Sequence, residues 1–212
     1  MRGCLVTLEG SEGAGKSTCM ETVRAILSHR GIDVVTTREP GGTALGERLR
    51  AILLDPGIEG ISADVELLMM FAARAQHIHD VIEPALSRGS WVISDRFTDA
   101  SYAYQGGGRG LQSHRIAELE NWVQGKLRPD LTLLLDTPVE LGLERAGNRS
   151  QPDRFEAENL AFFDRVRATY LARADSEPQR IRVIATDQTL DEVKSGIEQT
   201  LRDFLQARGY QD

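Results

Sequence analysis

The sequence predicts a single α/β domain built on a five-stranded parallel sheet with helices on both faces. Short apolar runs recur along the 212 residues, helical patterns separate them, and a glycine-rich segment joins the first run to the first helix. Alternation of this kind requires crossover connections, so the strands run parallel and the helices pack on both faces. The chain is long enough to bury one substantial core.

Five segments have the apolar character of buried strands. They are Leu5–Leu8, Val34–Thr37, Trp91–Ser94, Leu131–Leu135 and Ile181–Ile184. In a parallel sheet, ligands bind beyond the carboxyl ends of the strands. Polar segments begin there, at Gly10, Arg38, Asp95 and Asp136, so we expect them to meet in one site.

Helix boundaries agree with this division of the chain. The first helix is expected to run to about Arg30, with Gly31 as its C-terminal stop. Thr137, Pro138 and Glu140 have the spacing of a cap residue, a proline at the first helical position and a capping-box glutamate. Thr189 and Glu192 repeat the capping box before the last helix.

The first strand leads into a phosphate-binding loop. The run fits the pattern G-x-x-x-x-G-K-[ST] and comprises Gly10, Ser11, Glu12, Gly13, Ala14, Gly15, Lys16 and Ser17, with Thr18 following. Glycines let successive backbone N–H groups wrap a phosphate, and the helix N-terminus adds positive charge. Lys16 is placed to reach the β- and γ-phosphates, and Ser17 to ligate Mg²⁺. We therefore predict a P-loop fold that binds a nucleoside triphosphate.

Composition excludes several other classes of protein. The net charge of −7 argues against a nucleic-acid clamp, and no segment is long and apolar enough to cross a membrane. Two cysteines, Cys4 and Cys19, are expected to be small buried residues in a reducing compartment. No signal peptide is evident, so we expect a cytoplasmic protein that binds neither nucleic acid nor membrane.

Arginines accompany each of the later polar segments. Arg38 follows the second strand, Arg74 lies in an apolar helix, Arg96 follows the third strand, and Arg145, Arg149 and Arg154 surround a polar segment after the fourth. Phosphoryl transfer requires cations of this kind, and a guanidinium can grip a phosphate at two points. Residues 105–110 and 146–153 are expected to be loops over the site. His77 and His79 are two apart on a helix and are expected to be solvated or partly buried, not a metal pair.

The chain resembles the thymidylate kinase family over essentially its whole length. The resemblance rests on the phosphate loop, on Arg38–Thr43 (Arg-Glu-Pro-Gly-Gly-Thr), on Asp95–Phe97 with Ser101–Gly106, and on Pro129–Leu131 leading to Leu135 and Asp136. It implies transfer of the ATP γ-phosphoryl group to dTMP, giving dTDP and ADP for dTTP synthesis, with Mg²⁺ as the cofactor. It also implies a homodimer.

The resemblance implies a role for each site residue. Lys16, Asp95, Arg96, Arg149 and Arg154 would be catalytic, and Ser17 and Asp95 would hold the metal and its water shell. ATP would bind the loop from Gly10 to Thr18, with Arg145. The acceptor dTMP would contact Glu12, Glu39, Pro40, Arg50, Met70, Arg74, Arg96, Ser101, Tyr104 and Gln105. Within that set, Arg96 and Arg50 would clamp the phosphate and Arg74 would read the thymine edge.

Members of this family carry the catalytic arginine either in the phosphate loop or in a lid. Positions Ser11 to Ala14 hold no arginine, so the chain resembles the lid-arginine type common among bacterial members, with a lid at about 145–154. The family usually places an aromatic residue four positions before the base-reading arginine. Here that position is Met70, followed by Phe71, which we expect to be helix core.

Three other functions are consistent with a phosphate loop. The first is a kinase for another nucleoside monophosphate or for a deoxynucleoside, which a nucleotide panel would distinguish. The second is a GTPase-like switch, which typically reads guanine with an Asn-Lys-x-Asp run, and this sequence has none. The third is a nucleic-acid-dependent ATPase, against which the acidic balance weighs.

Overall fold

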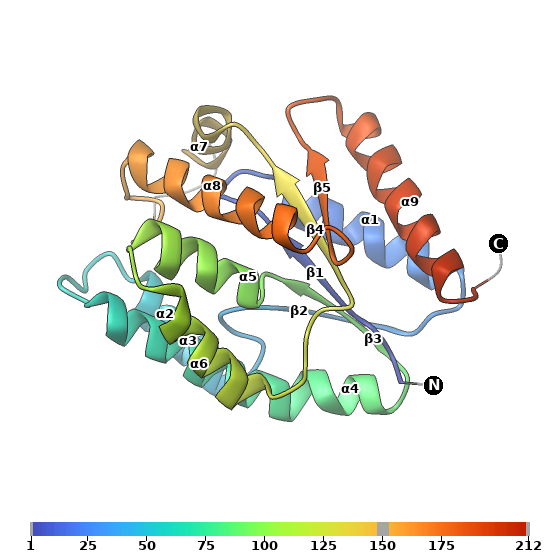
Figure 1. Cartoon of the computed structure of the whole chain (residues 1–212), viewed down its shortest axis with the longest axis horizontal. Coiled ribbons are helices and arrows are strands. Elements are labelled where there is room, and N and C mark those ends of the chain that lie inside the picture. The colour runs from blue at the N-terminus through green and yellow to red at the C-terminus, as the bar shows by residue number, and fades with distance from the viewer. Residues whose placement is uncertain (1, 148–152, 211–212) are drawn as a thin grey trace.

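The computed structural model describes residues 2–147 and 153–210 and contains a five-stranded parallel sheet in the order β2-β3-β1-β4-β5 (Figure 1). The strands are β1 (Leu5–Glu9), β2 (Val34–Arg38), β3 (Trp91–Asp95), β4 (Leu131–Asp136) and β5 (Ile181–Ala185). The predicted α/β fold and all five strands are confirmed. Each strand ends one residue later than predicted, and four of the added residues are charged.

The central position of β1 places the phosphate loop at the middle of the sheet's carboxyl edge. In the sheet register, Leu8 pairs with Asp95 of β3 and with Leu133 of β4. The side chains of Leu5, Val6 and Leu8 are fully buried, which is typical of a strand covered on both faces. The loop after β1 therefore emerges between the ends of β3 and β4, where a topological switch point creates a crevice.

Helices cover both faces of the sheet. They are α1 (Lys16–His29), α2 (Ala44–Leu54), α3 (Ala63–His77), the π-helix η1 (Ile78–Ile82), α4 (Glu83–Ser87), α5 (Thr98–Ser101), the π-helix η2 (Tyr102–Gly108), α6 (Ser113–Gln124), α7 (Val139–Gly147), α8 (Leu160–Ser176) and α9 (Leu190–Ala207). Helices α1 and α9 lie on one side, and α4, α5 and α8 on the other (Figure 1). None of the helices within the described ranges has the length and apolarity of a membrane span.

The core separates into layers because side chains alternate across the strands. Val6, Leu8 and Leu133 pack with α1 and α9 in one cluster. Leu5 and Val92 face the opposite side and pack with η1 and α4. Leu134 packs with the buried face of α8. Both faces of the sheet are thus covered by helices.

Helix ends follow the predicted signals with one exception. Gly31, at φ 72°, ends the first helix, and Thr189 with Glu192 forms the capping box of α9. Helix α7, however, begins at Val139, and the Thr137 hydroxyl is hydrogen-bonded to the Thr186 hydroxyl. The predicted capping role of Thr137 is wrong because a partner at the end of β5 engages that hydroxyl.

The expected loop at residues 105–110 is largely helical. Residues 102–108 form η2, and Gln105 is buried. Glycine here permits close packing: a Cβ on Gly107 would lie 2.8 Å from the carbonyl oxygen of Arg165 in α8 and closer still to the Thr169 hydroxyl. Helix α8 thereby holds η2 against the site.

Replacing Gly107 with alanine is expected to lower the free energy of unfolding by about 2 kcal/mol, because the added methyl group forces η2 away from the backbone of α8. A thermal melt should show a decrease in Tm of about 4–8 °C. Gly147→Ala is the matched control, since a Cβ at Gly147 meets no atom of the described residues within 4 Å. Equal melting temperatures for the two variants would contradict the close-packing explanation.

Candidate active site

Backbone geometry of the phosphate loop depends on its glycines. Gly10, Gly13 and Gly15 have positive φ angles of 139°, 70° and 85°, a conformation that side chains disfavour. A Cβ on Gly13 would also collide with the carbonyl oxygen of Gly142 in α7. Lys16 begins α1, and its Nζ donates to the carbonyl oxygens of Gly10 and Ser11 at 3.2 and 2.9 Å. The lysine therefore extends back along the loop.

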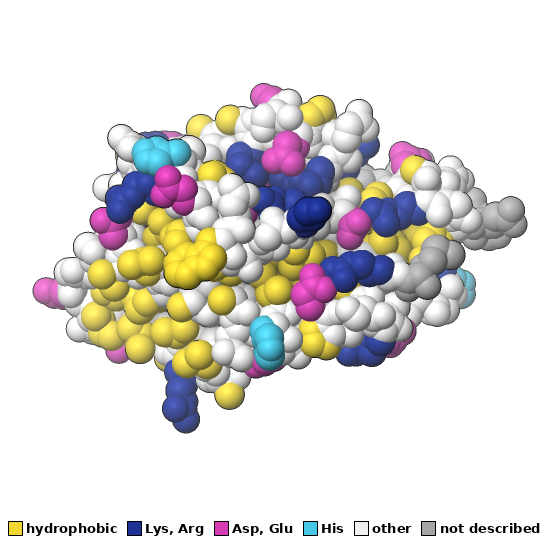
Figure 2. All heavy atoms as spheres, turned by 60° about the horizontal axis from the view of Figure 1, so that its bottom comes forward, with side chains coloured by type: hydrophobic (Ala, Val, Ile, Leu, Met, Phe, Trp, Pro, Cys, Tyr) yellow, Lys and Arg dark blue, Asp and Glu magenta, His cyan; other side chains and the backbone are white. Residues whose placement is uncertain are grey.

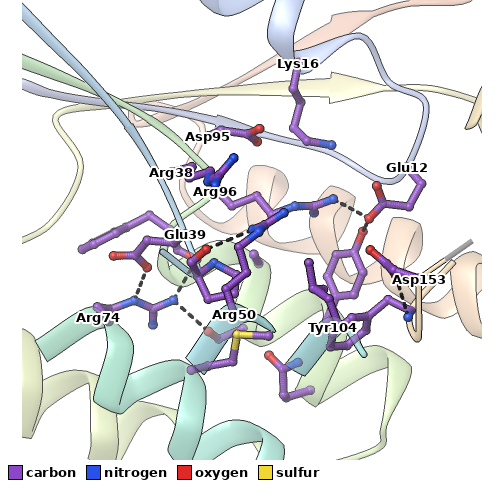
Figure 3. A pocket seen from close by; sticks show the side chains of 18 residues that line it. Glu12, Lys16, Arg38, Glu39, Arg50, Arg74, Asp95, Arg96, Tyr104 and Asp153 are labelled. Carbon is purple, nitrogen blue, oxygen red and sulfur yellow. Dashed lines mark hydrogen bonds and ion pairs between the residues drawn. The ribbon is translucent and has the colours of Figure 1, made fainter. Parts of the chain in front are cut away.

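One cavity collects every residue predicted to bind the acceptor (Figure 3). Its lining comes from the phosphate loop, the segment after β2, helices α2 and α3, the segment after β3, and η2. The predicted residues that line it are Glu12, Lys16, Glu39, Pro40, Arg50, Met70, Arg74, Asp95, Arg96, Ser101, Tyr104 and Gln105. Segments far apart in the sequence thus meet at the carboxyl edge of the sheet.

Arg96 occupies the centre of this cavity. Its backbone is left-handed at φ 69°, which is rare for a residue with a side chain. Two backbone hydrogen bonds hold this turn: Arg96 N donates to Leu8 O at 2.9 Å, and Phe97 N donates to the Glu9 carboxylate at 2.7 Å. The turn directs the guanidinium toward the phosphate loop, where it donates to Gly10 O and to Glu12 at 2.9 and 2.6 Å.

Glu12 is held as a carboxylate beside Arg96. Burial alone would raise its pKa, but the charges of Arg96 and Lys16 and a hydrogen bond from the Tyr104 hydroxyl outweigh that effect and lower the pKa to about 2. The Arg96 guanidinium also lies 4.7 Å from the centre of the Tyr104 ring. These contacts fix the orientation of both Arg96 and Glu12.

The buried carboxyl group of Glu9 helps to hold Arg96 and the turn after β3 in place. One oxygen accepts from Phe97 N and the other from the Tyr170 hydroxyl of α8 at 2.8 Å. Burial, reinforced by the negative charge of Asp99, raises the pKa of Glu9 to about 7 despite these hydrogen bonds and the nearby Arg96. Glu9 of β1 is thus hydrogen-bonded both to the turn after β3 and to α8, next to the phosphate loop.

Cations crowd the side of the cavity next to the loop. Arg50 reaches across from α2 and donates to Pro40 O at 2.9 Å. Burial lowers its pKa, and the positive charges of Arg38 and Arg96 lower it further. Burial and Arg96 likewise lower the pKa of Lys16. An anion placed among these groups would relieve their repulsion, so this end of the cavity suits a phosphate.

Asp95 lines the same region and has the features of a metal-associated carboxylate. Its Oδ1 is buried and has no hydrogen-bond partner in the described parts of the chain. The same ranges contain no cluster of three or more His, Cys, Asp or Glu side chains suited to a metal. Mg²⁺ in nucleotide sites needs no such cluster, since one carboxylate, a loop hydroxyl and phosphate oxygens suffice. Asp95 and the exposed Ser17 therefore fit Mg²⁺ bound together with a nucleotide.

The opposite end of the cavity is shaped around Arg74. Its Nε donates to Glu39 at 2.6 Å, and its Nη2 donates to Phe97 O and to the Ser101 hydroxyl at 3.1 and 3.0 Å. The guanidinium lies 4.5 Å from the centre of the Phe71 ring. Its buried Nη1 has no partner among the described residues. This end therefore combines a rigid donor with apolar surface, as recognition of a planar base requires.

Met70 and Phe71 differ in their surroundings. Met70 lines the cavity, whereas Phe71 is 2% exposed and packs in the core with Leu67 and Ile116. The expectation that Phe71 is helix core is confirmed. A methionine thus occupies the position where the family usually carries an aromatic ring.

The predicted lid arginines are not equivalent. Arg154 does not line the cavity: its Nε donates to Leu53 O at 2.7 Å, and its Nη2 forms a 2.6 Å ion pair with the buried Glu66. In this structure α2 and α3 engage the Arg154 guanidinium, and the expected contact with the transferring phosphoryl group stays a prediction. Arg149 lies outside the described residues. Arg145 donates to Thr186 O at 3.0 Å, beside the loop after β5.

Several lining residues were absent from the predicted set. They are Arg38, Leu54, Phe97, Ala100, Asp153 and Phe155. Arg38 and Phe97 lie within recognised motifs, next to Glu39 and Arg96. Their place in the sequence was therefore enough to predict that they line the cavity. Asp153 and Phe155 flank Arg154 in the sequence. The turn at these residues directs Asp153 and Phe155 into the cavity and Arg154 toward α3, which no local sequence pattern indicates.

A phosphate loop at the centre of a parallel sheet, a cation-lined acceptor end and a base-sized apolar end define a P-loop kinase acting on nucleoside monophosphates. The family model of thymidylate kinase matches residues 8–197. The chain belongs to the thymidylate kinase family.

Individual relatives agree with this assignment. The chain is 58% identical over 206 residues to the thymidylate kinase of Pseudomonas syringae pv. tomato, covering 97% of this chain and 98% of the relative. It is 58% identical over 207 residues to that of Ectopseudomonas mendocina, with 98% and 99% coverage. The crystal structure of thymidylate kinase from Ehrlichia chaffeensis superposes with a TM-score of 0.77 at 29% identity, covering 96% of this chain and 99% of that one.

Proposed function

We infer that this enzyme transfers the γ-phosphoryl group of ATP to dTMP, giving dTDP and ADP. One observation carries the inference: every residue expected to bind the acceptor lines one cavity, which Lys16 of the phosphate loop also lines. The acceptor phosphate is already an anion, so its attack needs no strong general base. Positioning and stabilisation of charge account for the rate.

The acceptor lies in the cavity with its phosphate held by Arg96 and Arg50. In this arrangement Glu12 faces the sugar, and Tyr104 and Gln105 line the sugar and base region. Arg74 donates to the edge of the base, with Ser101 fixing its orientation, and Met70 and Pro40 pack beside the ring. The pairing of Arg96 with Glu12 supports this placement, because it joins the phosphate clamp to the sugar contact.

The donor ATP binds the loop from Gly10 to Thr18, with Arg145 beside the nucleotide. Ser17 and Asp95 hold Mg²⁺, which neutralises charge on the donor phosphates when bound. Lys16 contacts the phosphates that separate during transfer. The buried, unpartnered oxygen of Asp95 supports its part in this proposal.

A nucleotide panel tests the function. We expect dTMP to give the fastest ADP release in a coupled assay with ATP and Mg²⁺, ahead of dUMP, CMP and thymidine. Faster turnover of any of those acceptors would overturn the choice of dTMP while leaving a kinase of the same class. ATP turnover that dTMP does not stimulate would overturn the kinase itself.

The lid contributes its cation through Arg149, and its closure excludes water from the transferring group. We expect Arg149→Ala to lower kcat by about 100-fold with little change in KM for dTMP. Arg154→Ala should lower the free energy of unfolding by about 2 kcal/mol, because the buried Glu66 loses its 2.6 Å ion pair and keeps the 3.3 Å pair with Arg109. Steady-state kinetics and thermal melts separate the two effects. Unchanged turnover in Arg149→Ala would exclude it as the catalytic cation.

The enzyme forms a homodimer through the face that carries α2, α3 and α6. Apolar side chains gather on that face in Figure 2, and exposed members include Leu45, Ile52, Val65, Leu68 and Trp122. Exposure of this extent is typical of a protein interface. Analytical ultracentrifugation should give the mass of a dimer.

A cytoplasmic location is supported by two buried free cysteines.

A further inference from the structure

His77 is the residue whose surroundings differ most from the sequence prediction. It ends α3 one turn after Arg74, and it is fully buried, whereas its neighbour His79 has a side chain 84% exposed. The expectation of a solvated or partly buried residue is correct for His79 and wrong for His77. A buried polar ring is stable only where both nitrogens find partners, so its contacts show what holds it.

Both ring nitrogens of His77 are hydrogen-bonded. Nδ1 lies 2.9 Å from Oε1 of Glu39, and Nε2 lies 2.6 Å from the Thr37 hydroxyl. A carboxylate can only accept, so Nδ1 carries the proton shared with Glu39. In the neutral ring, Nε2 then accepts from the hydroxyl. Glu39 thus fixes the tautomer of His77, and the Thr37 hydroxyl satisfies the remaining nitrogen.

Glu39 is shared by two residues of the same helix. Its Oε1 accepts from His77 and its Oε2 accepts from Arg74, while its side chain is 4% exposed. A carboxylate held at both oxygens cannot rotate without losing a hydrogen bond to a buried group. The position of Arg74 in the cavity therefore depends on the donor at Nδ1 of His77.

The glycine turn after Pro40 closes over the imidazole ring. Gly42 has φ 76°, and a Cβ there would lie 2.5 Å from both Cδ2 and Nε2 of His77 and 2.7 Å from the Thr37 hydroxyl. The second glycine of the Arg-Glu-Pro-Gly-Gly motif thus lets the chain pack against His77 besides turning it. The motif that carries Glu39 and Pro40 therefore packs directly against His77.

We propose that His77 is a positioning residue for base recognition, acting through Glu39 to hold the Arg74 guanidinium at the acceptor base. The inference rests on the proposed placement of the base beside Arg74. His77 does not line the cavity, so it contacts no substrate and its effect is confined to the base end. Arg96 donates to Gly10 O and Glu12 and contacts neither Glu39 nor His77, so we expect phosphate binding to persist without His77.

Two isosteric amides separate the nitrogens of His77. In His77→Asn the amide nitrogen reaches the position of Nδ1 and still donates to Glu39. In His77→Gln the amide reaches the position of Nε2 and keeps only the contact with Thr37. We expect His77→Gln to raise KM for dTMP about tenfold and His77→Asn to raise it less than about threefold. In both, kcat and KM for ATP should stay within about twofold of wild type.

An acceptor fragment without a base tests whether the effect is local. The inhibition constant of 2-deoxyribose 5-phosphate, measured against dTMP, should be the same in wild type, His77→Asn and His77→Gln. His79→Asn, in the adjoining π-helix η1, is the matched control and should leave every constant unchanged. Thr37→Val, which removes the hydroxyl at Nε2, should raise KM for dTMP in the same direction and provides the test if His77→Gln does not fold.

Three results would overturn the inference: equal KM values for dTMP in folded His77→Asn and His77→Gln, a rise in the inhibition constant of the fragment, or a loss confined to kcat. Arg74→Gln distinguishes this inference from the proposed base site. If Arg74→Gln leaves KM for dTMP unchanged, the proposed site is wrong. If it raises KM and His77→Gln does not, only the role of His77 is wrong.

Discussion

Replacing Arg96 with alanine is expected to reduce kcat/KM for dTMP by about three orders of magnitude. The guanidinium joins Gly10 O of the phosphate loop to the Glu12 carboxylate and lies over the Tyr104 ring. Its loss removes the proposed phosphate clamp and leaves Glu12 without its ion partner in a largely enclosed site. Removal of one preorganised donor commonly costs 100- to 1,000-fold, roughly, and arginines at transferring phosphoryl groups cost more.

Replacing Arg96 with lysine tests whether the site requires the geometry of the guanidinium or only its positive charge. Arg96→Lys keeps the positive charge, but one ammonium cannot reproduce two parallel donors directed at Gly10 and Glu12. We expect a loss of about 100-fold in kcat/KM. Arg24→Ala, on the exposed face of α1, is the control and should behave as wild type. A loss of less than tenfold in a folded Arg96→Ala enzyme would contradict the assignment.

Lys16→Met is expected to reduce kcat by about 1,000-fold or more while dTMP binding persists. Nζ of Lys16 extends along the phosphate loop to Gly10 O and Ser11 O, on the side of the cavity that adjoins the donor. Methionine keeps the length of the side chain and removes its charge. Calorimetric titration should therefore detect dTMP binding in a protein that produces almost no ADP.

Lys194→Met, on the exposed surface of α9, controls for loss of a lysine elsewhere. If Lys16→Met loses dTMP affinity in proportion to turnover, the lysine acts mainly on the acceptor. Turnover within tenfold of wild type would show that the loop backbone alone supports transfer.

Local patterns predicted the elements of the site with accuracy. The strand before Gly10, the helix from Lys16 and the stop at Gly31 each follow from residues within a few positions of one another. The acceptor residues were predicted through the resemblance, whose motifs at Arg38–Thr43 and Asp95–Phe97 are runs of adjacent residues. The structure brings these two motifs into one cavity because both lie at the carboxyl ends of neighbouring parallel strands, β2 and β3.

These local patterns could not predict contacts between residues that are far apart in the sequence. Arg154 has the spacing of a lid cation, yet Glu66, 88 residues away, engages it. Gly107 was interpreted as a loop residue, although α8 packs against it and requires the missing side chain. In each case a residue type is compatible with two environments, and only a partner from another element distinguishes them.

The sequence by itself determined the α/β class, the five strands, the phosphate loop and the family, because these depend on short-range periodicity and contiguous motifs. Tertiary structure alone decided that Arg96 adopts a left-handed turn toward Glu12, that Arg154 faces α3, and that His77 is buried against Glu39. The physical reason is that charges and polar rings in a folded chain are placed by the partners that satisfy them. Those partners are assembled only when separate segments meet.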